Sequence, residues 1–230
     1  LPWQVLAREV GAELAYVRVS DEGRLDLDAL DHLLRGPVKL VALAHVSNVL
    51  GTLNPAREIV ARCQAAGARV LVDAAQSVPH LPVDVAALGV DFYASSPHKW
   101  IQAPKGTGVL YVREAMRESL RAASVTWGQK KWEGSARRYE DYGTRDLVPI
   151  LTLGHALGCQ DRIGAERKGQ RLKELWHHAR AAAERTAGVI WRSPTRWELS
   201  GSLYAVEAPG RDSGELFKRL YEDHGFVFRA

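Results

Sequence analysis

Cysteine is scarce in this chain of 230 residues, which contains two cysteines and a single methionine. Cys63 and Cys159 lie far apart and without the close spacing of metal ligands, so neither a disulfide framework nor a metal site is expected. Because both fall in helical patterns, they are predicted to be core residues rather than nucleophiles. With so few cysteines, a reducing cytoplasm is the expected compartment.

Long hydrophobic runs and charge of one sign are also missing. No stretch approaches about 18 consecutive apolar residues, so no membrane span is expected, and the first residues do not have the pattern expected of a secretory signal. The net charge is +4, and the densest basic group, Lys130, Lys131, Arg137 and Arg138, has the character of a solvated loop. Neither a basic stripe nor a known binding motif accompanies this charge, so nucleic acid is not an expected partner.

What remains is the composition of an ordinary globular protein, with 46% apolar and 25% charged residues. The length is enough for one large domain or a domain and a half. The chain begins with Leu1, and its last residues, "FVFRA", end within a strand pattern. We therefore expect a piece of a longer protein.

Strand and helix patterns alternate in the first part of the chain. Residues 38–46, "VKLVALAHV", form the nearly continuous apolar run of a strand covered on both faces. Asn54 is expected to cap a helix that begins at Pro55 and stops at Gly67. The alternation predicts a doubly wound α/β layer with a mostly parallel sheet. The other elements predicted here are strands at 13–20, 68–75, 90–95 and one ending at Val112, and a helix at 26–36.

The pattern changes after about residue 145. A long helical stretch with a break near Gly164 is followed by short strands, a helix capped by Asp212 or Ser213, and the "FVFRA" strand. The sequence thus predicts a large domain over residues 1–148. Residues 149–230 are predicted to form a linking helix and part of a smaller α+β domain.

Polar residues follow three of the predicted parallel strands. Ligands of an open α/β sheet bind outside the carboxyl ends of its strands, so we expect these side chains to lie along one rim. The residues are His45, Ser47 and Asn48 in "HVSN", Asp73 and Gln76 in "DAAQ", and Ser95, Ser96, His98 and Lys99 in "SSPHK".

Each of these residues also has a simpler interpretation. Asp73 could cap a helix and Asn48 could be a turn residue. His98 could be a structural histidine and Lys99 a surface lysine. The set is more informative than any single member.

Pyridoxal phosphate (PLP) chemistry requires such a set of side chains. A lysine, here Lys99, forms the Schiff base and can carry protons at the substrate carbon, while a carboxylate, here Asp73, keeps the pyridine nitrogen protonated. Serine hydroxyls, an imidazole and turn amides can bind the phosphate. Asn48 or Gln76 can donate to the phenolate oxygen.

Three stretches, "HVSNVLGTLNP", "LVDAAQSVPHLPVDV" and "DFYASSPHKWIQAPKGTGVLYV", resemble the class V aminotransferase family of fold-type I PLP enzymes, which includes cysteine desulfurases and isopenicillin N epimerase-like proteins. The resemblance implies the PLP fold-type I large domain and a homodimer with shared active sites. It assigns the Schiff base to Lys99 and the pyridinium partner to Asp73. It further implies that Gln76 and Asn48 contact the phenolate side, that Ser96 and His98 bind the phosphate, that Thr144 reaches the phosphate of the neighbouring subunit, and that Arg229 lies near the substrate.

The chain departs from the family pattern in three respects. Pro97 stands where the family usually has glycine, which removes one N–H donor near the phosphate. The family's phosphate loop and ring-stacking residue would precede "LPWQ". Neither Cys63 nor Cys159 matches the mobile cysteine of desulfurases, which the family places beyond the end of this chain.

Several functions remain open at this point. The leading hypothesis is a PLP-dependent enzyme acting at the α-carbon of an amino acid or amino-acid conjugate. "HKW" and "EGSARRYEDYGTRD" slightly favour the epimerase or C–S lyase branch, whereas "VPHLPVDV" and "HVSNVLGT" look like desulfurases. A transaminase, a cysteine desulfurase and a non-catalytic truncated homologue are the alternatives. A nucleotide-binding protein is disfavoured because no strand precedes a glycine-rich phosphate motif.

Overall fold

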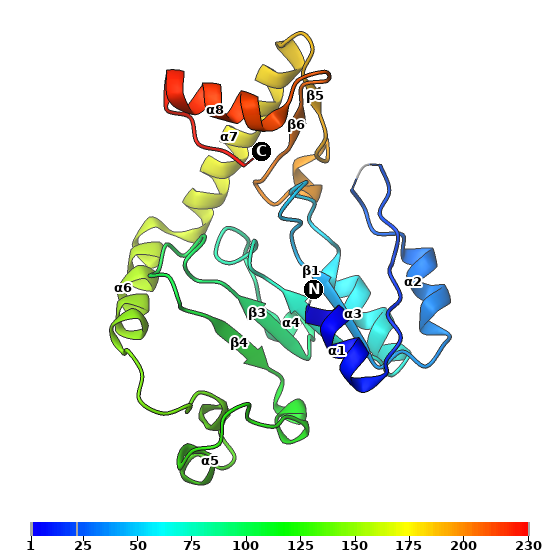
Figure 1. The fold of residues 1–230 in the computed structure, drawn as a ribbon, viewed down its shortest axis with the longest axis vertical. Helices are drawn as coiled ribbons and strands as arrows, with labels where there is room; N and C mark the ends of the chain where they lie inside the picture. Colours follow the sequence, from blue (N-terminus) through cyan, green and yellow to red (C-terminus); the bar gives the residue numbers. More distant parts are fainter. Residues whose placement is uncertain (1, 22, 230) are drawn as a thin grey trace.

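The computed structural model describes residues 2–21 and 23–229. Its centre is a four-stranded sheet in the order β1-β2-β3-β4 (Figure 1). The first three strands are parallel, and the last pairs antiparallel with β3, which confirms the predicted mostly parallel α/β fold. The strands are β1 (Leu40–Ala44), β2 (Arg69–Asp73), β3 (Phe92–Ser95) and β4 (Val109–Val112).

Three helices cover one face of the sheet. They are α2 (Leu27–Leu34), α3 (Ala56–Ala65) and α4 (Val85–Leu88). Between them and the strands lies the main core, in which Val70 and Val72 of β2 are fully buried. Because strand side chains alternate between the two faces, these valines mark the covered face.

The opposite face of the sheet is largely open in the described part of the chain. The register places Ala42, Leu71 and Ala94 on this face, where Pro2 and Trp3 of α1 (Pro2–Val10) line a pocket together with them. β1 was expected to be covered on both faces, and this prediction is wrong for the described residues: Leu40 is 38% exposed. The reason is that the covering helices all lie on the valine side.

Two predicted strands do not form. Residues 13–20 make only an isolated bridge between Val19 and Leu25, and Tyr16 is exposed. Residues 226–229 of "FVFRA" are also irregular, while Ala230 lies outside the described residues. Alternating sequence favours a strand, but ladder hydrogen bonds require a neighbouring strand, and none lies beside these segments in the described chain.

One of the two predicted helix caps is confirmed, and α2 has a cap that was not predicted. Asp26 accepts the Ala29 N–H at the start of α2, and Asp212 accepts the Glu215 N–H at the start of α8 (Ser213–His224). Asn54, however, does not cap α3. Its Nδ2 donates to the Ala44 carbonyl at 2.8 Å, which ties the loop to the end of β1.

The second half begins with α6 (Val148–Ile163) and α7 (Ala165–Arg185), which are separated at Gly164 as predicted. The helices rise to a two-stranded sheet, β5 (Ile190–Trp191) and β6 (Val206–Glu207), and to α8 (Figure 1). None of the described helices is both long and apolar enough to cross a membrane. The remaining short helical turns are η1 (Glu114–Ser119), α5 (Gly128–Lys131), η2 (Ala136–Tyr139) and η3 (Trp197–Leu199).

A small aromatic core organises this second half. Trp176 of α7 is 1% exposed, and Trp191 and Trp197 meet its ring edge-on at centroid distances of 5.6 and 5.9 Å. Edge-to-face contacts of this kind add to the stabilisation from burial alone. The second half therefore has apolar packing of its own.

Backbone contacts join the two halves. The Leu53 N–H donates to Leu199 at 2.8 Å, and the Gly201 N–H donates to Gly51 at 2.7 Å. Gly51 has a φ of +68°, and a side chain there would overlap the Leu203 carbonyl. The close approach therefore requires glycine at this position.

Candidate functional site

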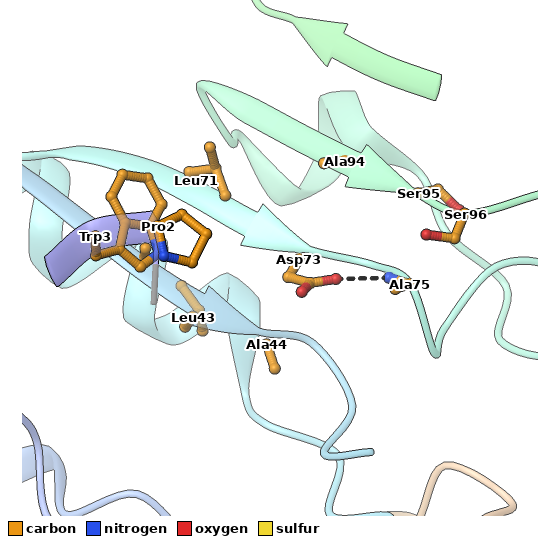
Figure 2. Close-up of a pocket in the computed structure, with 11 residues that line it drawn as sticks. Pro2, Trp3, Leu43, Ala44, Leu71, Asp73, Ala75, Ala94, Ser95 and Ser96 are labelled. Carbon is orange, nitrogen blue, oxygen red and sulfur yellow. Dashed lines mark hydrogen bonds between the residues drawn. The ribbon is translucent and has the colours of Figure 1, made fainter. Parts of the chain in front are cut away.

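A pocket of about 410 Å³ opens on the uncovered face, at the carboxyl ends of the parallel strands (Figure 2). This is the place where open α/β sheets bind ligands. Three of the predicted polar residues, Asp73, Ser95 and Ser96, lie together in its wall. The other lining residues are Pro2, Trp3, Ala42, Leu43, Ala44, Leu71, Ala75 and Ala94.

Asp73 is the last residue of β2, and its side chain is exposed. Its strand neighbours in register are Ala44 and Ala94, whose small side chains leave the carboxylate open. One oxygen, Oδ1, accepts the Ala75 N–H at 2.9 Å, as Figure 2 shows. The carboxylate is thus oriented by a turn rather than by a helix N-terminus, and Oδ2 can receive a ligand.

The serines extend the pocket beyond the end of β3. The Ser95 Oγ is buried and has no hydrogen-bond partner among the described residues. Ser95 alternates with Ala94 along β3, so this hydroxyl lies on the helix-covered side with Tyr93, while the residue as a whole borders the pocket. Pro97 is fully buried, and its carbonyl accepts the Ala103 N–H at 3.1 Å. The proline therefore packs inside the turn that carries Lys99 and helps to close it.

Lys99 lies in a tight turn that begins directly after the serines. Its N–H donates to the Ser96 carbonyl at 3.1 Å, and its carbonyl accepts the Gln102 N–H at 3.2 Å. The side chains of His98 and Lys99 are exposed, and neither belongs to the pocket wall. The structure therefore brings Asp73 and the serines together, with His98 and Lys99 on the adjoining turn.

The remaining predicted residues lie outside the pocket wall. Asn48 is exposed in the turn after β1, and Gln76 is half-buried in the turn after β2. Thr144 is exposed in the segment before α6, and Arg229 is exposed after α8. Asn48 and Gln76 thus share the strand-end rim, whereas Thr144 and Arg229 come from other parts of the chain.

A buried polar network supports the rim from the helix-covered side. The Tyr93 hydroxyl of β3 lies 2.9 Å from His45 Nδ1 and 3.0 Å from Ser77 Oγ. Burial lowers the pKa of His45 and raises the pKa of Tyr93, which keeps both groups neutral at neutral pH. His45 therefore joins the strand ends and is not a ligand group of the pocket.

The two cysteines have different environments. Cys63 is fully buried in the core as predicted, and burial raises its thiol pKa to about 11. Cys159 was also predicted to be a core residue, and this is wrong: it is exposed on α6, with Arg162 Nη2 at 3.0 Å from its sulfur. Within residues 2–21 and 23–229, no group of three or more His, Cys, Asp or Glu side chains could hold a metal ion.

Two features of the site were not predicted from the sequence. Pro2 and Trp3 of α1 form one wall of the pocket, over Leu43 and Leu71 (Figure 2). The Trp100 indole donates to Gln76 Oε1 at 2.9 Å. Helical spacing in "PWQVLAREV" could have suggested the helix, but nothing in the sequence indicates which strands it approaches.

The mostly parallel sheet and its polar strand-end pocket define an α/β protein with a candidate ligand site at this rim. Residues 1–228 match the family described as Aminotransferase class-V. The chain belongs to this family, as its sequence motifs indicated.

Individual relatives are similar over much of the chain. It is 36% identical to the probable cysteine desulfurase 2 of Mycobacterium leprae (strain TN) over 100% of this chain and 56% of that protein. It is 37% identical to a cysteine desulfurase of Escherichia coli O8 (strain IAI1) over 84% of this chain and 50% of that protein. The chain thus spans about half the length of the curated relatives it matches.

The fold is also that of a solved structure. The apo cysteine desulfurase from Thermococcus onnurineus NA1 superimposes with a TM-score of 0.87 and 30% identity, covering 99% of this chain and 58% of that one. The mixed, mostly parallel sheet is therefore the large-domain sheet of PLP fold-type I proteins, as expected from the sequence.

Proposed function

We propose that the protein is a PLP-dependent enzyme that acts at the α-carbon of an amino acid, and that its reaction is cysteine desulfuration. The observation that carries this proposal is the pocket that holds Asp73, Ser95 and Ser96 at the carboxyl ends of adjacent strands. A carboxylate and hydroxyls at one rim suit the two ends of PLP, the ring nitrogen and the phosphate.

The residues of the rim fit the cofactor by their chemistry. Bound PLP supplies an electron sink for the bonds of the substrate's α-carbon. Asp73 would hold a negative charge at the pyridine nitrogen, and Ser96 and His98 would donate to the phosphate. The exposed amine of Lys99 would hold the cofactor and carry the proton at the α-carbon.

The choice of reaction rests on the relatives. The sequence leaned slightly toward an epimerase or C–S lyase, but the relatives above are cysteine desulfurases by name, which favours the alternative reading. In this reaction L-cysteine and an acceptor thiol give L-alanine and a persulfide, so no oxidant is required. Cys63 is a poor acceptor because its thiol is buried and protonated.

The proposal predicts that the protein with added PLP converts L-cysteine to L-alanine when dithiothreitol is present as acceptor. Cys63→Ser and Cys159→Ser are matched controls, and each should keep the rate because neither cysteine lies in the pocket wall. Amino-acid chromatography measures the alanine. Racemised substrate or pyruvate in place of alanine would contradict desulfuration and support the epimerase or lyase reading.

We also propose that two copies form a homodimer in which Thr144 reaches the neighbouring cofactor phosphate. Large apolar side chains near Thr144 are exposed, and a partner surface would remove them from water. Among them Trp127 is 90% and Val148 is 67% exposed. Sedimentation velocity should give a dimer that Trp127→Glu weakens, whereas a monomer at all concentrations would contradict the proposal.

A further inference from the structure

Trp100 follows Lys99 directly and contacts the turn after β2. Its indole Nε1–H donates to Gln76 Oε1 at 2.9 Å, in a half-buried setting. The ring also lies against His80, with a centroid distance of 4.3 Å. His80 is 5% exposed, so this side of the indole is shielded from water. Trp100 therefore joins the Lys99 turn to the Gln76 turn.

The indole fixes which way the Gln76 amide faces. An indole N–H is only a donor, so the amide must present its oxygen to Trp100. The amide nitrogen, Nε2, then faces away, and it has no acceptor among the described residues. An amide held in this way presents its N–H groups, rather than its oxygen, on the side away from Trp100.

We infer that Trp100 is a positioning residue that holds Gln76 as a hydrogen-bond donor toward the phenolate oxygen of the cofactor. The inference rests on the proposed function. Without the indole N–H, the amide could rotate and present its oxygen, which would repel the phenolate rather than stabilise it. Trp100 thereby acts through Gln76 and does not itself touch the reacting atoms.

The environment of the indole suits this role. Burial lowers the pKa of His80 to about 4, so its ring is neutral at neutral pH and brings no charge to the Gln76 amide. On the far side of the Lys99 turn, Gln160 of α6 donates to the Ile101 carbonyl at 3.1 Å. The turn is therefore tethered twice, and only the Trp100 tether involves a predicted cofactor residue.

The test measures the pH midpoint at which the near-visible absorption of the PLP-loaded protein changes. A donor to the phenolate stabilises the deprotonated, more negative form and therefore lowers this midpoint. Trp100→Phe keeps an aromatic ring against His80 but removes the N–H, so the midpoint should rise by about half a pH unit. Gln76→Ala should raise it by at least as much.

The double variant gives the decisive comparison. If Trp100 acts through Gln76, adding Trp100→Phe to Gln76→Ala should move the midpoint no further. Gln160→Met is the matched control, because it removes the other tether of the same turn and should leave the midpoint unchanged. Other titratable groups near the turn are the same in all these variants: Asp73 of β2, His45, Tyr93 of β3, His80, His98, Lys99 and Lys168 of α7.

Additive shifts, or an unchanged midpoint in Trp100→Phe, would contradict the inference while leaving the proposed function intact. A wild-type protein without PLP absorption would instead contradict the proposed function. The cofactor-free protein gives a separate readout: hydrogen exchange of the Trp100 indole N–H, followed by NMR, should become several-fold faster in Gln76→Ala. An unchanged exchange rate would contradict the hydrogen bond itself.

Discussion

The two carboxylate oxygens of Asp73 have different surroundings. The Ala75 N–H holds Oδ1, and the small side chains of Ala44 and Ala94 leave Oδ2 open to the pocket. The position at the end of a buried strand was readable from the sequence, because a hydrophobic run followed by a polar residue marks a strand end. The orientation of the carboxylate was not readable, because it depends on the turn that follows.

The open carboxylate leads to a prediction for Asp73→Asn. The neutral amide cannot hold a charge against the pyridine nitrogen, so proton removal at the α-carbon should slow roughly 10²-fold. The Lys99 amine is unaffected, so PLP absorption should persist. Stopped-flow absorption after mixing with L-cysteine separates the two effects, and an unchanged rate would exclude Asp73 as the charge partner.

His80 gives a prediction for the pH dependence of stability. Burial lowers its folded-state pKa to about 4, so the unfolded chain binds more protons between about pH 6.5 and pH 4. The free energy of unfolding is therefore not reduced by His80 above pH 6.5. It falls by on the order of 3 kcal/mol as the pH is lowered toward 4.

Urea unfolding at several pH values measures this slope. His80→Phe should flatten it, whereas His32→Gln, which changes an exposed histidine, should not. An equal slope in wild type and His80→Phe would show that His80 is not the titrating group.

At the scale of elements, the successes and errors of sequence reasoning have one physical cause. The helix that begins after Asp212 was predicted because its cap is a local hydrogen bond, and the helix at 26–36 was predicted from its local spacing. The strand at 13–20 was wrong because a strand depends on a neighbour that the local sequence does not specify. Asn54 was misassigned for the same reason, since its partner is the Ala44 carbonyl ten residues away.

The contact between the loop after β1 and the segment before β6 predicts a steric effect at Gly51. A side chain there would overlap the Leu203 carbonyl, so Gly51→Ala should cost about 2 kcal/mol or more of unfolding free energy beyond its backbone strain. Gly67→Ala is the control, because Gly67 has a similar φ of +75° but open space around it. Thermal unfolding measures both, and equal losses would mean that the close approach does not constrain the fold.

At the scale of the whole molecule, the chain combines two packed regions that meet near the candidate site. The helix-covered core supports the strand ends, while the Trp176 cluster supports the second half. The Gln160 side chain donates to the Ile101 carbonyl and so connects α6 to the Lys99 turn. The division of the chain near residue 148 stays a prediction from the sequence patterns, and the residues that join the two regions were not predicted.

The central claim is that Lys99 and the strand-end pocket bind PLP. Its most direct measurement is the near-visible absorption of the purified protein, before and after addition of PLP and removal of the excess, alongside Lys99→Ala. The account predicts a retained absorption band in the wild type that Lys99→Ala lacks. A band of equal strength in Lys99→Ala, or no band in the wild type after PLP addition, would contradict it.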